Sequence, residues 1–146
     1  GCYYASHGPV VSFNGDGGIQ MNIQELQTIA RERLPIKIVL MNNSALGMIR
    51  HFQEMYFGEN YVQTVATGGY TVPDFGAIAK AYGIEYYKIE SADDVRASLF
   101  EGVAPCLIEV SIKENTYVFP KLEFGKPNQD QEPLMDRALF NYLSSL

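Results

Sequence analysis

Cysteine, histidine and tryptophan are scarce in this chain, and their scarcity excludes several kinds of site. The sequence has two cysteines, two histidines and no tryptophan. Cys2 and Cys106 lack the close spacing of a zinc site and are too few for a disulfide framework, so we expect reduced thiols in an intracellular protein. His7 is expected at a surface turn and His51 on a polar helix face, which makes both weak candidates for acid–base catalysis.

Basic residues and long apolar runs are also in short supply. The chain has 11 Lys and Arg against 17 Asp and Glu, a net charge of −6 and an isoelectric point near 4.8. Such an acidic chain is unsuited to nucleic acid, and any anionic ligand must be held by local dipoles or by a metal ion. No apolar run approaches the roughly 20 residues that cross a bilayer, and no signal peptide is visible. We therefore expect a cytoplasmic protein without nucleic-acid or membrane partners.

The sequence begins without an initiator methionine. Residues 1–8 look like the end of a helix that closes at Gly8-Pro9. We interpret the chain as a fragment of a longer polypeptide.

Apolar residues alternate between strand and helix patterns along the first 116 residues. β-Branched apolar runs predict strands at 10–14, 36–41, 84–89 and 105–112, the first two of them buried. Helical spacing of apolar residues, with Pro73 and Ser91 as start signals, predicts helices at 19–30, 45–57, 73–82 and 91–101. This alternation is typical of a three-layer α/β/α domain with a mainly parallel sheet.

The character of the chain changes after residue 116. Residues 117–131 are irregular and polar, and a short helix is expected from Pro133 to Leu143. We therefore divide the chain into a domain at 1–116 and a tail at 117–146. The tail could cover an active site or pack on its own domain.

Two short motifs follow the first two predicted strands. Gly15-Asp16-Gly17-Gly18 ends the first strand, and Asn42-Asn43 ends the second. A right-handed crossover between parallel strands places both strand ends at the same edge of the sheet. We therefore expect Asp16 and Asn43 to face one crevice, where open α/β sheets bind ligands.

The residue types in these motifs suit an anion that is bound together with a metal ion. Glycines let backbone N–H groups approach an anion, and the start of a helix adds a positive partial charge. Asp16 would repel a phosphate unless it holds a divalent cation that bridges to it. Asn43 offers an amide oxygen as a second ligand, and a carbonyl of the turn at 44–46 offers a third. The motif has neither the lysine of a P-loop nor the third glycine of a dinucleotide-binding fingerprint.

Each feature taken alone has an ordinary structural explanation. Asp16 by itself would be a turn or helix-cap residue, and Met48 by itself would be a core residue. The pair Tyr86-Tyr87 fits aromatic packing within a strand. The combination of Asp16 with Asn43 at this spacing is what favours ligand binding.

These residues resemble the binding motif of thiamine-diphosphate enzymes. The wider sequence is similar to acetolactate synthase large (catalytic) subunits, over about residues 10–112 and most strongly over 15–54. The shared segments are Gly15–Leu26, Leu34–Lys37, Asn42–Met48, Gln53-Glu54, Pro73–Phe75 and Ala81–Gly83. Residues 120–125 are more similar to acetolactate-synthase-like proteins of uncertain substrate than to the biosynthetic enzyme of branched-chain amino acids.

The resemblance implies a role for each motif residue. Asp16 and Asn43 would bind Mg²⁺ through their side chains, and Ala45 would bind it through its carbonyl. Met48 and Phe52 would line the substrate pocket. The residues next to thiamine diphosphate would be Gly15, Asp16, Gly17, Gly18, Asn43, Gly47 and Met48. The implied reaction is decarboxylation of a 2-keto acid, with transfer of the remainder to an acceptor.

Two departures from the family concern the acceptor. Phe52 stands where the synthases carry a tryptophan that lines the acceptor pocket, and Glu59-Asn60-Tyr61 replaces an Arg-Tyr pair. Another 2-keto acid decarboxylase or carboligase is therefore an alternative, and a non-catalytic assembly domain of the same fold is a second one.

The resemblance also implies partners that lie outside these 146 residues. Family enzymes pair this domain with a pyrimidine-binding domain of the same or another subunit, which supplies the activating glutamate. We therefore expect no catalytic residue in this fragment, an inactive isolated chain, and a homodimer or homotetramer for the full-length protein. Some relatives hold FAD in a further domain, so FAD is a candidate cofactor beside thiamine diphosphate and Mg²⁺.

Overall fold

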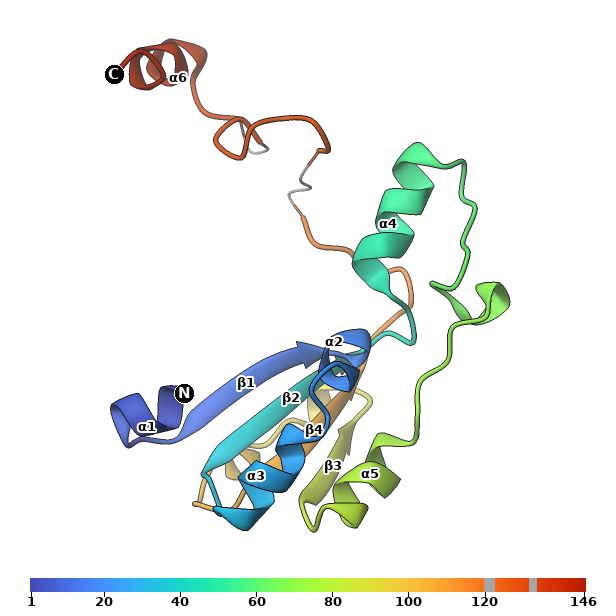
Figure 1. Ribbon diagram of the computed structural model, residues 1–146, viewed down its shortest axis with the longest axis vertical. Coiled ribbons are helices and arrows are strands. Elements are labelled where there is room, and N and C mark those ends of the chain that lie inside the picture. Colours follow the sequence, from blue (N-terminus) through green and yellow to red (C-terminus); the bar gives the residue numbers. More distant parts are fainter. Residues whose placement is uncertain (120–122, 132–133) are drawn as a thin grey trace. The chain divides into compact units, whose positions relative to one another are not determined.

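The computed structural model describes residues 1–119, 123–131 and 134–146. Contacts between Cα atoms divide the chain into two units, Gly1–Thr116 and Tyr117–Leu146. The first unit is built on a four-stranded sheet in the order β1-β2-β4-β3 (Figure 1). Every pair of neighbouring strands is parallel, which confirms the predicted α/β class.

The four strands lie close to their predicted positions. They are β1 (Val10–Gly15), β2 (Ile36–Asn42), β3 (Glu85–Ile89) and β4 (Cys106–Ser111). β2 and β4 form the middle of the sheet, and their central residues are buried. Because the strands are parallel and in register, Gly15 pairs with Met41, and Asn42 pairs with Ser111. The carboxyl ends of β1, β2 and β4 therefore meet at one edge.

The prediction that β1 is a buried strand is wrong. Among the described residues β1 pairs only with β2, and its burial alternates between half-buried and exposed. Phe13 is 71% exposed, and Val11 is exposed as well. The β-branched composition identified the strand correctly, but composition does not show whether a neighbour covers it.

One face of the sheet packs against three short helices. They are α2 (Asp16–Gln20), α3 (Glu25–Arg31) and α5 (Phe75–Ala81), which begins after the N-cap Asp74. Their apolar side chains and those of the sheet form one buried cluster, made of Ile19, Leu26, Ile38, Leu40, Phe75, Ala79, Ile84 and Leu107.

The single helix expected at 19–30 is divided into α2 and α3. Between them the amides of Met21, Asn22 and Glu25 bond to carbonyls three residues earlier, so the backbone is wound more tightly than in an α-helix. Ile19 and Leu26 still reach the same core. Hydrophobic spacing therefore located the buried side correctly and missed the change in hydrogen bonding.

The prediction of a single helix at 91–101 is also wrong. The segment forms two 3₁₀ turns, η2 (Ala92–Asp94) and η3 (Ala97–Leu99), separated by extended backbone. Ser91 does begin η2, through a capping box with Asp94. Leu99 packs on the second face of the sheet, against a small cluster of Ile89, Cys106 and Ile108.

Two further helices belong to the first unit. α1 (Cys2–Ser6) ends at His7, which has a left-handed backbone conformation. α4 (Gly47–Tyr56) begins two residues later than predicted and has no buried residue. The loop that follows carries the turn η1 (Ala66–Gly68) and leads to α5.

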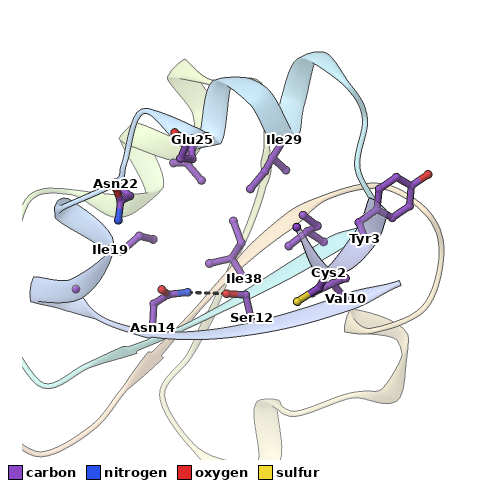
Figure 2. A pocket seen from close by; sticks show the side chains of 14 residues that line it. Cys2, Tyr3, Val10, Ser12, Asn14, Ile19, Asn22, Glu25, Ile29 and Ile38 are labelled. Carbon is purple, nitrogen blue, oxygen red and sulfur yellow. Dashed lines mark hydrogen bonds between the residues drawn. The ribbon is translucent and has the colours of Figure 1, made fainter. Parts of the chain in front are cut away.

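A hollow of about 280 Å³ lies between β1 and the helices α2 and α3. Val10, Ser12 and Asn14 line it from the strand, and Ile19 and Ile29 line it from the helices (Figure 2). Within it the Asn14 amide donates to Ser12 Oγ over 3.0 Å. Neither Asp16 nor Asn43 belongs to its lining.

The second unit carries α6 (Arg137–Leu143), within the range predicted for a tail helix. The Gln131 side chain bonds to backbone atoms of Glu123, and the Arg137 guanidinium pairs with Asp130 at 2.6 Å. Pro133, the expected start of the tail helix, and residues 120–122 of the family comparison lie outside the described residues. In the part of the chain that the structure describes, no helix has the length and apolar character needed to span a membrane.

Candidate functional site

Asp16 and Asn43 meet at the edge where β1 and β2 end. The Ala45 amide donates to Asp16 Oδ2 over 3.1 Å and to Asn43 Oδ1 over 3.3 Å. Two side-chain oxygens from separate strand ends therefore lie around one backbone nitrogen. This is the juxtaposition that the crossover argument predicted for these two residues.

Both side chains are withdrawn from solvent. Asp16 is 2% exposed and Asn43 is 9% exposed. Burial raises the pKa of the Asp16 carboxyl above its ordinary value, although the amides of Gly17 and Ala45, which bond to it, lower it in part. A carboxylate placed in this way is stabilised in its ionised form by a cation at the same site.

The turn after β2 is shaped by the Asn42 side chain. Ser44 has a φ of 53°, a left-handed conformation that is uncommon for a residue other than glycine. Its amide donates to Asn42 Oδ1 over 2.9 Å, as in an Asx turn. Leu46 is held in turn by a bond from its amide to the Thr64 carbonyl. These bonds direct the Ala45 amide toward Asp16 and Asn43.

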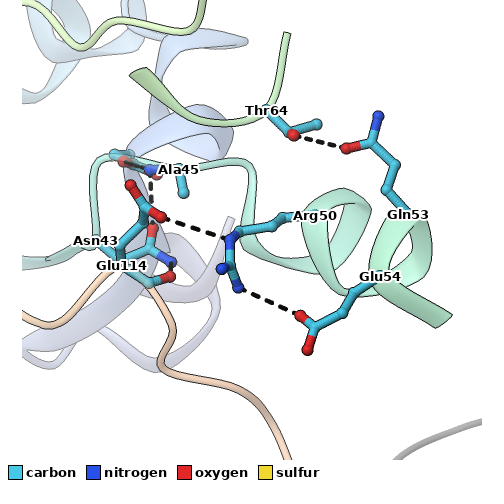
Figure 3. Close-up of polar contacts among 8 residues, drawn as sticks. Asn43, Ala45, Arg50, Gln53, Glu54, Thr64 and Glu114 are labelled. Carbon is cyan, nitrogen blue, oxygen red and sulfur yellow. Dashed lines mark hydrogen bonds and ion pairs between the residues drawn. The ribbon is translucent and has the colours of Figure 1, made fainter. Parts of the chain in front are cut away.

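Asn43 is also held from its other end. Its Nδ2 lies 3.4 Å from the Glu114 carbonyl oxygen, which follows β4. The carboxylate of Glu114 pairs with Arg50 of α4 at 3.5 Å, and Arg50 also pairs with Glu54 at 3.5 Å (Figure 3). With the nitrogen of the amide turned to Glu114, the oxygen of Asn43 faces Asp16 and Ala45.

The second half of α4 and the loop beyond it are joined by further polar contacts. Thr64 Oγ1 donates to Gln53 Oε1 over 2.6 Å (Figure 3). Gln53 Nε2 also donates to the Val62 carbonyl. Thr64 is buried. Because Thr64 also accepts from the Leu46 amide, the loop and the helix are fixed together next to the turn.

The glycines of the first motif and Gly47 of α4 differ in the space around them. A Cβ at Gly47 would lie 2.9 Å from Asn43 Nδ2, and one at Gly17 would lie 2.4 Å from Leu46 Cδ2. A Cβ at Gly15 or Gly18 would meet no atom within 4 Å. Gly17 and Gly47 therefore allow the turn and the helices to approach, whereas Gly15 and Gly18 border open space.

The remaining predicted residues lie on helices. Met48 and Phe52 belong to α4 and are both exposed, and the Phe52 ring lies 4.8 Å from that of Tyr56. Their proposed contact with substrate stays a prediction. His7 is exposed at the end of α1, and His51 lies within α4.

The donor set fits Mg²⁺ bound together with a diphosphate. Among the described residues, no three His, Cys, Asp or Glu side chains form a group that could hold a metal. Mg²⁺ needs no such group, because it uses one or two carboxylates and completes its octahedron with phosphate and water oxygens. Asp16, Asn43 and the Ala45 carbonyl would supply three ligand groups, which leaves positions for phosphate and water oxygens. Gly18, two residues after Asp16, borders open space.

Several polar residues near the site escaped the sequence argument. Glu109 lies within β4 and bonds to Asn42, and the Tyr70 hydroxyl lies beside α2. Burial, followed by the charge of Asp16, raises the pKa of Tyr70. A single acid inside the apolar run at 105–112 was a usable signal for Glu109, whereas Tyr70 carries no such signal.

Comparison with known proteins gives concordant results. Residues 1–110 match the model of the C-terminal TPP-binding domain of thiamine pyrophosphate enzymes. The acetolactate synthase isozyme 2 large subunit of Escherichia coli is 41% identical over 124 residues, which cover 83% of this chain and 22% of that protein. The acetolactate synthase large subunit of Porphyra purpurea is 37% identical over 122 residues, covering 82% of this chain and 20% of that protein.

A solved structure shares the fold. The thiamine diphosphate-dependent 4-hydroxybenzoylformate decarboxylase of Rhodococcus jostii superposes with a TM-score of 0.65 at 29% identity, over 75% of this chain and 21% of that chain. The chain thus spans about a fifth of the length of the proteins that it matches. It belongs to the thiamine pyrophosphate enzyme family, as a C-terminal TPP-binding domain of the acetolactate-synthase-like kind.

Proposed function

We propose that this domain binds the diphosphate of thiamine diphosphate through Mg²⁺ held by Asp16, Asn43 and the Ala45 carbonyl. The observation that carries the proposal is the approach of Asp16 Oδ2 and Asn43 Oδ1 to the same Ala45 amide. A cation at this site also offsets the repulsion between the Asp16 carboxylate and the diphosphate, in a chain whose net charge is −6.

The chain's own residues would act by binding and orientation. The amides of Gly17 and Ala45 hold the two oxygens of Asp16 in place, so that the carboxylate needs little rearrangement to accept a cation. Gly18 leaves room for a phosphate to approach the backbone of α2. The bound cofactor would supply the electron sink for decarboxylation, and the protein would supply positioning and electrostatics.

The proposed activity of the full-length protein is that of an acetolactate-synthase-like enzyme. It would decarboxylate a 2-keto acid and transfer the remainder to an acceptor, in support of branched-chain amino acid synthesis. The identities of 41% and 37% to acetolactate synthase large subunits support this choice. Another 2-keto acid decarboxylase or carboligase is the second candidate, favoured by Phe52 in the acceptor position and by the likeness to a decarboxylase structure.

The same proposal includes a pyrimidine-binding domain of the same or another subunit and a homodimeric or homotetrameric assembly. Exposed apolar side chains of α4 and its end support an interface there: Met48, Ile49, Phe52, Tyr56 and Phe57. A cytoplasmic location and FAD in a further domain stay predictions.

Titration calorimetry of the full-length protein with thiamine diphosphate tests the metal assignment. We expect binding that requires Mg²⁺ in the wild type and is lost in Asp16→Ala. Asp93→Ala, which removes an exposed acid of η2, is the matched control and should bind as the wild type does. Undiminished binding by Asp16→Ala would refute the metal assignment, and a wild type that binds no thiamine diphosphate would refute the proposed function.

A further inference from the structure

An acid in the middle of the sheet is bound at both of its oxygens. Glu109 lies in β4, between β2 and β3, and is 7% exposed (Figure 1). Its Oε1 accepts from Asn42 Nδ2 over 2.7 Å, and its Oε2 accepts from the Tyr86 hydroxyl over 2.7 Å. The carboxylate therefore links the side chains of all three strands.

Stability alone is a weak reason for a carboxylate at this position. The neighbouring residues Leu107, Ile108 and Val110 are apolar, and a buried polar network is often replaced by apolar residues without loss of stability. The pKa of Tyr86 is raised, chiefly by burial and next by its hydrogen bond to Glu109. The Tyr86 hydroxyl therefore keeps its proton and acts as a donor to Glu109.

Hydrogen bonds of the Asn42 side chain connect Glu109 to the turn that carries the candidate metal ligands. Asn42 uses its nitrogen for Glu109 and its oxygen for the Ser44 amide, over 2.9 Å. Because both ends of one amide group are bonded, its orientation is fixed. Ser44, in its left-handed conformation, is the residue between Asn43 and Ala45. The position of those two residues thus depends on the Asn42 side chain.

We infer that Glu109 is a positioning residue for the metal site: it holds the Asn42 amide, which in turn holds the Asn43–Ala45 turn in the conformation that presents two of the three Mg²⁺ ligands. The inference rests on the proposed function. In this inference Glu109 acts through Asn42, to which it is bonded, and is not itself one of the three proposed ligands. Its action resembles that of outer-shell partners in other metal sites, whose loss lowers metal affinity about 10- to 100-fold.

An exchange of groups between positions 42 and 109 separates positioning from general stability. Asn42→Asp keeps an oxygen for the Ser44 amide but places two carboxylates against each other. Glu109→Gln combined with Asn42→Asp restores the pair with donor and acceptor reversed, at unchanged net charge. The amide introduced at position 109 would then donate to the carboxylate introduced at position 42 and accept from the Tyr86 hydroxyl.

The measurement is the Mg²⁺ and thiamine diphosphate affinity of the full-length protein by titration calorimetry, with thermal unfolding of the ligand-free protein beside it. Lys37→Met is the matched control, because Lys37 is buried in β2 at the opposite end of the sheet and donates to the Ala104 carbonyl over 2.6 Å. We expect Asn42→Asp to lower the affinity about 10- to 100-fold, the double variant to recover most of it, and Lys37→Met to change only the unfolding temperature.

Two results would overturn the inference while leaving the proposed function intact. One is wild-type affinity in Asn42→Asp, with Asp16→Ala still unable to bind. The other is a double variant that folds as the wild type does and binds no better than Asn42→Asp. Failure of the proposed function has a different signature, since the wild type would then show no Mg²⁺-dependent binding of thiamine diphosphate.

Discussion

Replacing Gly47 by alanine tests how closely α4 approaches the candidate metal ligand Asn43. The added Cβ would lie 2.9 Å from Asn43 Nδ2, whereas ordinary contacts begin at 3.4 Å, so the amide must move by about half an ångström. Gly47 has no positive φ and is the first residue of α4, so alanine fits its backbone. The strain therefore falls on the Asn43 side chain.

The expected effects on folding and on binding differ in size. The displaced amide would lose its long bond to the Glu114 carbonyl, about 1 kcal/mol, and the preference of a helix for alanine over glycine offsets part of that loss, so the free energy of unfolding of the ligand-free protein should change by no more than about 1 kcal/mol. Metal–ligand distances tolerate about 0.2 Å, so a shift of half an ångström at Asn43 should weaken Mg²⁺-dependent binding. We expect a loss of about 10- to 100-fold, or about 1.4–2.7 kcal/mol.

Thermal unfolding of the ligand-free full-length protein and calorimetric titration with Mg²⁺ and thiamine diphosphate measure the two effects. Gly8→Ala is the control, since a Cβ there would lie 3.8 Å or more from its neighbours. Wild-type affinity in Gly47→Ala, with folding unchanged, would refute the argument that Asn43 supplies a metal ligand from this position.

Three further predictions concern the diphosphate, the acid at the site and the core. Gly18→Ala should leave the ligand-free protein as stable as the wild type but weaken thiamine diphosphate binding, since its Cβ enters open space; equal binding in a titration would show that the diphosphate lies elsewhere. The raised pKa of Asp16 means that the folded state keeps a proton that the unfolded state has lost, so without a cation the free energy of unfolding should fall as the pH rises from 3.8 through the raised pKa. Asp16→Asn should remove that slope in denaturant titrations, and an identical slope in both proteins would contradict the assignment. Leu40→Ala, at a fully buried position of β2, should lower the free energy of unfolding by about 2–5 kcal/mol, and a loss below about 1 kcal/mol would show that the site is not packed as described.

The sequence was sufficient to predict the parallel sheet and the approach of Asp16 to Asn43. Both follow from chain-local patterns: apolar strand runs, helical spacing, and the rule that parallel strands end at one edge. The same reasoning failed for β1, because the burial of a strand depends on neighbours that its own residues do not specify. It also failed at 91–101, where a correct N-cap at Ser91 leads only into a 3₁₀ turn.

The supporting residues of the site were harder to predict. Asn42 was visible in the motif, but its role depends on its contact with Glu109, which is distant in sequence. The role also depends on the left-handed conformation of Ser44, which no sequence pattern predicts. Thr64 and Gln53 meet across a loop whose folding no periodic pattern describes. A motif identifies residues that bind a ligand, whereas the residues that orient them are found from the fold.

A crystal structure of the full-length protein with thiamine diphosphate and Mn²⁺ in place of Mg²⁺ tests the central claim most directly, because Mn²⁺ can be located by its anomalous signal. The account predicts one anomalous peak within about 2.4 Å of the Asp16 carboxylate, the Asn43 amide oxygen and the Ala45 carbonyl. A peak bound to the diphosphate but away from Asp16 and Asn43 would contradict it.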